Sequence, residues 1–344
     1  MPKAPRHRSP SFRRRLVALS TLILLATGQA TQAQRLDGFN VIAAEGHPFG
    51  SASARQALKT ARALGAKAVA VIPFLWQPTP SSEEIVRGSD MGDAELAAAI
   101  RDARALGFFV LVKPHVWVPG SWAGAVEPGS EAAWRAWFTR YRVEILRIAR
   151  VAQAEGADAL ALGTELTKAI GRPEWLELTV AVRAVFTREL IYVAHDLKEA
   201  EAVPFWDRLD AIGVSLYPPL GSDEDRAGRI ATMQGVAEGL DRLAKRVDKP
   251  VIVAEIGVRS AVGAAAKPWE SAEERVARAD PQLQADLLAD WLGALNRPSV
   301  RSVLVWRWLT DPRAGGVADT DFTVQGKPAE RILMCAWAAG CAKP

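Results

Sequence analysis

Two glutamates end apolar segments that are typical of buried strands. Glu165 lies in Ala-Leu-Gly-Thr-Glu-Leu at 161–166, and Glu255 lies in Val-Ala-Glu-Ile-Gly at 253–257. Glutamate is uncommon in strands and is rarely buried without a partner, so the pair indicates a catalytic site; for either residue alone, an ion-pair or capping role is the alternative. Cleavage of a glycosidic bond uses such a pair: one carboxyl group protonates the leaving oxygen, and one carboxylate acts as nucleophile or as base for water.

Tryptophans and polar side chains follow the same predicted strands. Aromatic rings can pack against the C–H faces of a sugar, and polar groups at their edges can bind its hydroxyls. Tyr217 can also donate to a neighbouring carboxylate. The residues that we expect to contact a substrate are Trp76, Lys113, His115, Trp117, His195, Asp196, Tyr217, Trp269, Trp306, Trp308 and Asp319. Packing in the core is the alternative for these tryptophans, and we expect it for those in predicted helices, Trp134, Trp137, Trp175, Trp206, Trp291 and Trp337.

Other kinds of chemistry find little support in the sequence. The dipeptide His195-Asp196 can serve as a metal or acid–base unit, but no His-x-His pair or carboxylate-rich string accompanies it. The chain also has no phosphate-binding Gly-x-x-x-x-Gly-Lys-Ser/Thr, no Gly-x-Ser-x-Gly and no Gly-x-Gly-x-x-Gly after a strand. We therefore expect neither a metal nor another cofactor.

Eight short apolar segments alternate with eight longer amphipathic ones, and these elements must position the two glutamates. The predicted strands are 38–42, 68–73, 108–114, 157–164, 190–194, 211–215, 250–255 and 301–306. The predicted helices lie near 51–64, 93–106, 130–155, 174–187, 202–209, 229–246, 281–295 and 327–337. Continuous apolarity in the strands is typical of a parallel sheet covered on both faces. Eight such units predict an α/β fold, a single-domain (β/α)₈ TIM barrel, with its active site in the segments that follow the strands.

The start of the chain is typical of a signal peptide. An apolar run at 16–26 is too short to span a bilayer comfortably, and an uncleaved anchor helix is the alternative. Six of the 43 lysines and arginines precede it, and without them the 39 acidic residues outnumber the basic ones. We therefore predict a signal peptide at 1–33, a barrel domain at 34–344 and no nucleic-acid partner. The basic residues before the run are Lys3, Arg6, Arg8, Arg13, Arg14 and Arg15.

Export would place the mature protein in the periplasm or outside the cell. We expect it to be a monomer with no stable membrane insertion after cleavage of the signal. The chain has two cysteines, Cys335 and Cys341. In an oxidising compartment they could form a disulfide that closes a small C-terminal loop, and two free thiols are the alternative.

Several strings occur in the order that one known family shows. They include Gly38-Phe39-Asn40, Lys113-Pro114-His115, Gly163-Thr164-Glu165-Leu166, Tyr217-Pro218, Ala254-Glu255-Ile256-Gly257 with Arg259-Ser260, Pro268-Trp269, Trp306-Arg307-Trp308 and Asp319-Thr320-Asp321. Over about residues 38–333 the chain resembles glycoside hydrolase family 113, (β/α)₈ barrels of the retaining clan A whose characterised members are endo-β-1,4-mannanases. The resemblance implies that Glu165 is the general acid/base and Glu255 the nucleophile. It also implies that Trp306 or Trp308 forms the floor of the sugar site, and it adds Arg259 to the substrate-binding candidates.

Two positions depart from the family's pattern. Thr164 stands where asparagine commonly precedes the acid glutamate, and His195-Asp196 stands where the family tends to show Asn-Trp. The second change alters a sugar-contacting pair and leaves both glutamates in place.

We therefore expect an exported retaining glycoside hydrolase that cleaves a β-linked polysaccharide, with β-1,4-mannan as the polymer that the resemblance implies. The acid role requires a raised pKa of Glu165, which the negative charge of Glu255 can supply. Two other functions use the same cleft: a saccharide-binding barrel without turnover, and a transglycosylase acting on an exopolysaccharide.

Overall fold

The computed structural model describes residues 1–3, 35–88 and 91–338. The chain divides into two units by its internal contacts, with the boundary after Gln32. The unit Ala33–Pro344 contains the barrel. Nearly all of the predicted signal peptide lies outside the described residues, so it stays a prediction. Among the described residues, no helix combines the length and the apolarity that a membrane span requires.

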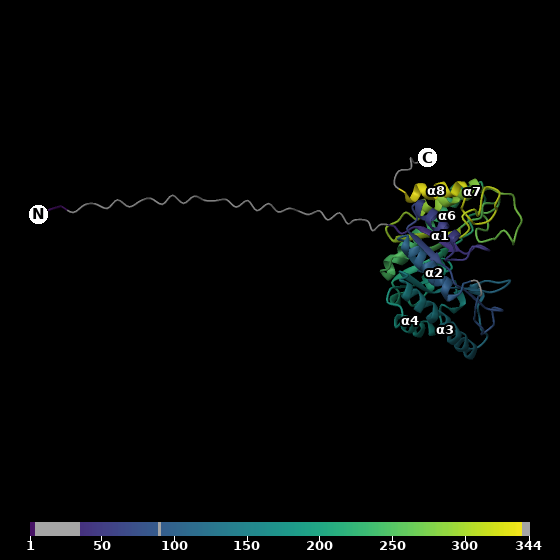
Figure 1. Cartoon of the computed structure of the whole chain (residues 1–344), viewed down its shortest axis with the longest axis horizontal. Coiled ribbons are helices and arrows are strands. Elements are labelled where there is room, and N and C mark those ends of the chain that lie inside the picture. Colours follow the sequence, from purple (N-terminus) through teal and green to yellow (C-terminus); the bar gives the residue numbers. More distant parts are fainter. Residues whose placement is uncertain (4–34, 89–90, 339–344) are drawn as a thin grey trace. The chain divides into compact units, whose positions relative to one another are not determined.

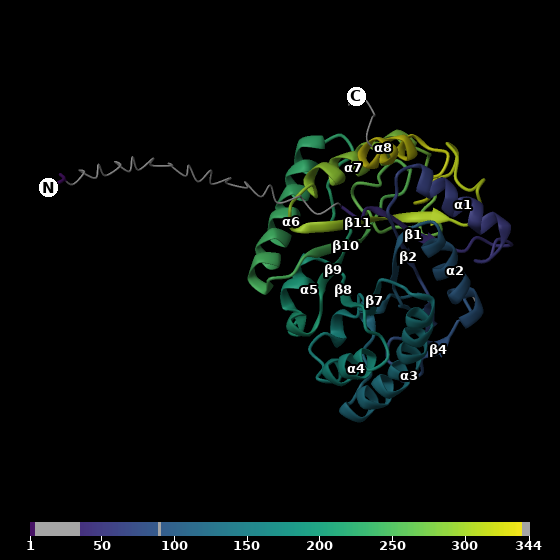
Figure 2. The same ribbon diagram turned by 60° about the vertical axis from the view of Figure 1, so that its left-hand side comes forward.

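Eight parallel strands close into a barrel, which confirms the predicted fold (Figure 2). Around the barrel they follow the order β1, β2, β5, β7, β8, β9, β10, β11. Their bounds are Gly38–Ile42 for β1, Ala68–Val71 for β2, Phe109–Val112 for β5, Ala159–Thr164 for β7, Glu189–Ala194 for β8, Ala211–Leu216 for β9, Val251–Ile256 for β10 and Val300–Leu309 for β11. Each strand lies within two or three residues of its predicted segment.

Helices alternate with these strands along the chain and lie outside the barrel (Figure 1). Several of the long helices begin at a short polar side chain that caps them: the Ser130 hydroxyl accepts from the Ala133 amide at the start of α3. The helix ends at Gly156, whose φ of 76° suits a residue without a side chain. The helices are α1 Ala52–Ala63, α2 Asp93–Ala105, α3 Glu131–Glu155, α4 Glu174–Arg183, α5 Leu197–Ala202, α6 Arg226–Val247, α7 Pro281–Ala294 and α8 Pro328–Trp337.

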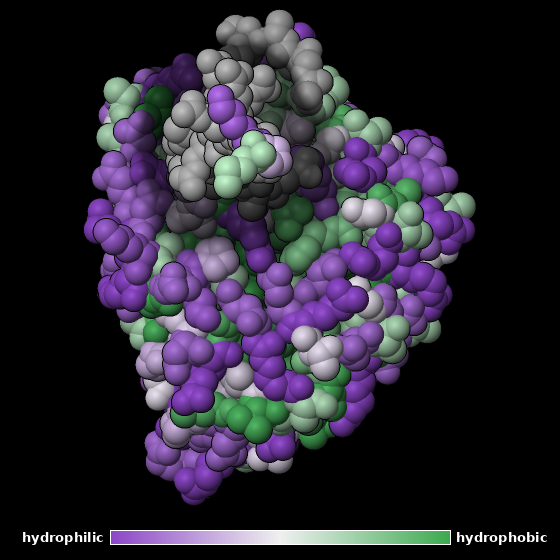
Figure 3. Space-filling model, turned by 90° about the vertical axis from the view of Figure 1, so that its left-hand side faces the viewer, coloured by the Kyte–Doolittle hydropathy of each residue, from purple (hydrophilic) through white to green (hydrophobic). Residues whose placement is uncertain are grey.

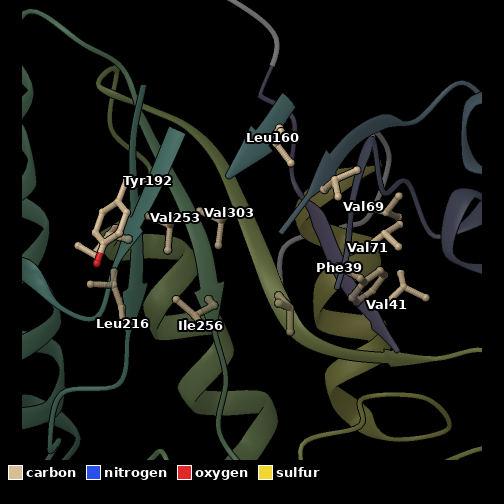
Figure 4. Packing of buried hydrophobic residues seen from close by; sticks show 14 of the residues in the cluster. Phe39, Val41, Val69, Val71, Leu160, Tyr192, Leu216, Val253, Ile256 and Val303 are labelled. Carbon is tan, nitrogen blue, oxygen red and sulfur yellow. The ribbon is translucent and has the colours of Figure 1, made fainter. Parts of the chain in front are cut away.

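The two faces of each strand contribute to different apolar layers. In β2, Val69 and Val71 belong to the large cluster between strands and helices, whereas Ala68 and Ala70 belong to a smaller cluster inside the barrel. Figure 4 shows side chains of the large cluster, among them Phe39. Both faces are buried, which explains why the strands are apolar without alternation. On the face shown in Figure 3, hydrophilic side chains predominate and apolar ones lie in scattered groups.

One predicted helix is in the wrong place. The fifth helix was expected at 202–209, but α5 spans Leu197–Ala202, and Trp206–Arg208 form a single 3₁₀ turn. Pro204 explains the difference, because the residue before a proline disfavours helical backbone and Val203 is accordingly extended. Asp196 starts the true helix by accepting a hydrogen bond from the Glu199 amide.

A second small sheet lies outside the barrel in two of the long loops. It contains β3 Phe74–Trp76, β4 Val86–Arg87 and β6 His115–Trp117, in the order β4, β3, β6. β3 follows β2 after Ile72 and Pro73, and β6 follows β5 after Lys113 and Pro114, so this parallel pair continues two neighbouring barrel strands. The sequence predicts loops, and no strands, in both segments.

One of the two cysteines of the predicted disulfide lies among the described residues. Cys335 lies in α8 and is disulfide-bonded. Cys341 lies outside the described residues.

Candidate active site

Glu165 and Glu255 lie at the carboxyl-terminal ends of β7 and β10, the fourth and seventh strands of the barrel. In both strands the pairing register shifts just before the glutamate, between Ala161 and Thr164 in β7 and between Val253 and Glu255 in β10. Such irregularities redirect side chains at the rims of barrels. Glu165 also has a positive φ of 56°, and its amide donates to the Val193 carbonyl at 2.8 Å.

Two donors from other strands hold the Glu255 carboxylate. The Tyr217 hydroxyl, just after β9, donates to Oε1 at 2.6 Å. The Lys113 ammonium, just after β5, forms an ion pair with Oε2, and the lysine side chain is fully buried. Burial, together with the charge of Glu255 and the hydrogen bond to it, raises the pKa of Tyr217 well above its usual range, so Tyr217 stays a donor. A carboxylate with one cationic and one phenolic donor is fixed in position, as a nucleophile must be.

His195 is the partner of Glu165. Its Nδ1 lies 3.2 Å from Oε2 of the glutamate. Burial opposes ionisation of Glu165, but the hydrogen bond from His195 and the charges of His115 and His195, with a smaller contribution from Ser215, outweigh it, so the pKa of Glu165 lies below its usual range. The expectation of a raised pKa for Glu165 is therefore wrong for this structure, because the hydrogen bond to His195 and the nearby histidine charges favour the ionised carboxyl group.

The two glutamates share a common set of neighbours. Ser215 is the register partner of Glu255 across β9 and β10, and its side chain also stabilises the charge of Glu165. His115 is close enough to both carboxylates for each to affect its pKa, which burial lowers overall. The geometry thus brings together six of the predicted site residues: Glu165, Glu255, Lys113, His115, His195 and Tyr217.

A third buried glutamate supports the Glu165 side of the site. Glu199 is 4% exposed, and it accepts hydrogen bonds from the Thr167 hydroxyl at 2.5 Å, the Tyr192 hydroxyl at 2.7 Å and the His195 amide at 3.1 Å. Tyr192 in turn accepts from the Leu166 amide at 3.0 Å. Glu199 is not among the site residues predicted from the sequence. The spacing Asp196-x-x-Glu199, typical of the start of a helix, is the signal that could have identified it.

Trp306 fits the predicted floor of the sugar site, and Trp308 does not. The half-buried Trp306 ring lies 5.6 Å from Lys113 Nζ and 5.8 Å from the Arg307 guanidinium carbon. Trp308 is 1% exposed, packs against Phe39 with ring centroids 4.8 Å apart and donates to the Ala57 carbonyl in α1 at 3.1 Å. Trp308 therefore belongs to the core, because its position in β11 directs it toward the helix layer.

Other aromatic residues surround the mouth of the barrel. Trp76 and Trp117 are register partners in the small sheet, with ring centroids 6.1 Å apart, and Trp117 is 48% exposed. Trp122 packs on His195 at 4.6 Å between ring centroids. Trp269 is also exposed and lies in the segment between β10 and α7.

Three polar candidates make contacts that hold loops and helix ends. Arg259 is fully buried, and its guanidinium donates to the carbonyls of Ser271, Arg275 and Thr320. Asp319 accepts from the Lys327 ammonium at 2.6 Å. Asp196 caps α5. For Arg259 the expected substrate contact is wrong, because the structure leaves its guanidinium buried among backbone carbonyls. Among the described residues, no group of three or more His, Cys, Asp or Glu is placed to hold a metal ion.

Comparison with known proteins gives consistent matches. Residues 38–327 match the model of Glycoside Hydrolase Family 113. A GH113 β-mannanase from Alicyclobacillus acidocaldarius, solved in complex with ManMIm, is 25% identical, with 88% of this chain and 97% of that chain covered and a TM-score of 0.79. Another GH113 β-1,4-mannanase is 26% identical, with 89% and 100% covered and a TM-score of 0.78. A β-glucuronidase from Ruminococcus gnavus, 12% identical with 89% and 50% covered and a TM-score of 0.62, shares the fold alone. No curated protein matches the chain.

Proposed function

The chain belongs to Glycoside Hydrolase Family 113 and is a glycoside hydrolase, and on this premise we propose that it is an exported retaining enzyme that hydrolyses β-1,4-mannan. The observation that carries the mechanism is the contrast between the two glutamates. Glu255 is held by the Lys113 ammonium and the Tyr217 hydroxyl, whereas Glu165 shares a hydrogen bond with a histidine that can carry a proton. Retaining hydrolysis needs one fixed nucleophile and one group that exchanges a proton.

The proposed reaction proceeds by double displacement. A Glu255 oxygen forms a bond to the anomeric carbon while the bond from that carbon to the leaving oxygen breaks, and Glu165 gives its proton to that oxygen. In the second step Glu165 removes a proton from water, the water oxygen attacks the anomeric carbon, and Glu255 leaves as a carboxylate. Lys113 and Tyr217 stabilise that carboxylate before attack and after release.

The proposed substrate rests on the matched structures. Both GH113 relatives are β-mannanases by their descriptions and cover most of this chain at about one quarter identity. Trp306 supplies a ring beside Lys113, on the Glu255 side of the site, against which the sugar can pack. Export rests on the basic and apolar residues before position 34.

The test compares the protein from residue 34 with its Glu255→Gln and Glu165→Gln variants on β-mannan, β-glucan, xylan and bacterial exopolysaccharides. We expect new reducing ends from β-mannan with the unaltered protein and none with Glu255→Gln, and a loss of about 10²- to 10⁴-fold with Glu165→Gln. Circular dichroism checks that both variants are folded. Full activity of Glu255→Gln, or activity on another polymer alone, contradicts the proposal.

Stereochemistry and cell fractionation test the remaining parts. Proton NMR during the first turnovers should show the β-anomer of the newly formed reducing end, since two displacements restore the original configuration. Initial release of the α-anomer overturns retention, and formation of longer oligosaccharides without a net gain in reducing ends indicates transglycosylation instead. Recovery of a protein that begins near residue 34 outside the cytoplasm supports export, whereas a full-length cytoplasmic protein overturns it.

A further inference from the structure

His195 is held in place from three sides. Its ring contacts Glu165 through Nδ1, 3.2 Å from Oε2. The Trp122 ring lies against it, with centroids 4.6 Å apart. Its own amide donates to the buried Glu199 carboxylate at 3.1 Å. The imidazole is 35% exposed and the Glu165 side chain 13%, so the hydrogen bond between them is largely shielded from water.

The other titratable groups around this pair are engaged elsewhere or do not contact Glu165, so His195 is the group that can carry its proton. From β10, Glu255 faces the pair but is paired with Lys113 from the end of β5. From β6, His115 is near, and its pKa is lowered by burial. From β9 come the Ser215 hydroxyl and the Tyr217 phenol, which donates to Glu255.

Two acidic groups of α5 complete these surroundings. Glu199 is hydrogen-bonded to three donors, and Asp196 caps the helix through Oδ1. Among the described residues, the His195 imidazole is therefore the titratable group that both contacts the Glu165 carboxyl directly and can take up its proton.

We propose that His195 is a positioning residue that stores the proton of Glu165, so that the two side chains act as one proton donor and acceptor. In the resting pair, Nδ1 carries the proton and Glu165 is ionised. When a glycosidic oxygen approaches, the proton moves from Nδ1 to the carboxyl group and from there to the leaving oxygen, which leaves neutral imidazole and carboxylate. In the second step the proton taken from water returns to Nδ1. The inference rests on the proposed role of Glu165 as acid/base.

The pair has a distinct pH dependence. Burial lowers the pKa of His195, but the hydrogen bond and the charge of Glu165 outweigh it and raise that pKa above its usual value. The proton is present below this pKa and is lost as the pH rises through it. Activity should therefore fall on the alkaline side at the pH where the pair, and not an isolated carboxyl group, loses its proton.

The first experiment compares His195→Gln with the unaltered enzyme. Glutamine keeps an N–H donor for Glu165 but cannot carry the proton, so the alkaline limb of kcat/KM on manno-oligosaccharides should move to lower pH by at least about one unit. His47→Gln is the matched control: it removes a histidine that pairs with Asp311 instead, Nε2 lying 3.8 Å from Oδ2, and the limb should stay in place. An unchanged limb in His195→Gln, or an equal shift in His47→Gln, overturns the inference.

A second experiment requires no turnover. The ¹⁵N chemical shifts of the His195 ring, followed by NMR against pH in the unaltered protein and in Glu165→Gln, should show that the imidazole titrates at lower pH in the variant, because the carboxylate that favours its proton is gone. Identical titration curves contradict the proposal even where His195→Gln does not fold.

A third comparison separates this inference from the proposed function. With an aryl β-mannoside whose leaving group needs no protonation, Glu165→Ala should keep a far larger fraction of the unaltered enzyme's first-step rate than it keeps with manno-oligosaccharides. If the rate falls by the same factor with both substrates, Glu165 is not the acid and the proposed function fails. If it behaves as expected while His195→Gln leaves the alkaline limb unmoved, only the role of His195 fails.

Discussion

At the scale of single residues, the sequence predicted the two glutamates and Tyr217 as a donor to a neighbouring carboxylate, but not the pairing of Lys113 with Glu255 or of His195 with Glu165. Each glutamate follows an apolar run, which is a local signal. The partner of Glu255 is Lys113, which is 142 positions away and meets it only because the barrel closes. Glu199 was missed for a similar reason, since its three donors come from two segments, Thr167 after β7 and Tyr192 with His195 at the end of β8.

The Tyr217 hydroxyl should matter for turnover. Tyr217→Phe removes the 2.6 Å hydrogen bond to Glu255 and leaves the ring. Because hydrogen bonds to charged groups contribute about 1.5–3 kcal/mol, kcat/KM on β-mannan should fall roughly 10- to 100-fold. Tyr141→Phe is the control: it removes another buried hydroxyl, which donates to the Leu162 carbonyl, and should lower stability by about 1 kcal/mol with little effect on kcat/KM. Equal kinetic losses in both variants would contradict a specific role for Tyr217.

At the scale of elements, long units were predictable and short ones were not. The 25 residues of α3 carry several turns of apolar periodicity, and its predicted bounds of 130–155 nearly match Glu131–Glu155. The six residues of α5 are too few for such a pattern, and the capping spacing from Asp196 and the stop at Pro204 were the informative signals. The strands of the small sheet have only two or three residues each, which is too short for any periodicity.

Asp196 offers a test of its role as a helix cap. Asp196→Ala removes the acceptor for the Glu199 amide and should lower the free energy of unfolding by about 1 kcal/mol in urea denaturation. Asp196→Asn keeps a capping oxygen and should change it by only a few tenths of that amount. If both variants retain full stability but lose affinity for manno-oligosaccharides, Asp196 contacts the substrate as the sequence suggested.

At the scale of the whole molecule, the alternation of strand and helix was sufficient to predict the barrel. Eight units place Glu165 on the fourth strand and Glu255 on the seventh, so the barrel carries both to one rim without any local signal that relates them. What alternation could not predict was the direction of individual side chains. Trp306 and Trp308 are two positions apart in β11, yet one borders the site and the other packs in the core.

These two tryptophans should respond differently to truncation. Trp308→Ala leaves a cavity in the core and should cost about 3–5 kcal/mol of stability, measured by chemical denaturation. Trp306→Ala removes a half-buried ring beside Lys113 and should lower kcat/KM on β-mannan with a smaller loss of stability. The reverse pattern would show that Trp308 is the residue that supports the sugar.

The left-handed backbone at Glu165 has an evolutionary consequence. Glycine and asparagine adopt this conformation readily, whereas other residues pay roughly 1 kcal/mol or more to do so. Selection for a durable fold and selection for turnover therefore favour different amino acids at one position. A descendant of this chain that no longer needed to cleave its polymer would gain by replacing Glu165 with glycine or asparagine. With the acid/base role that we propose for Glu165, we expect a glycine or asparagine at this position to mark members of the lineage that no longer cleave their polymer.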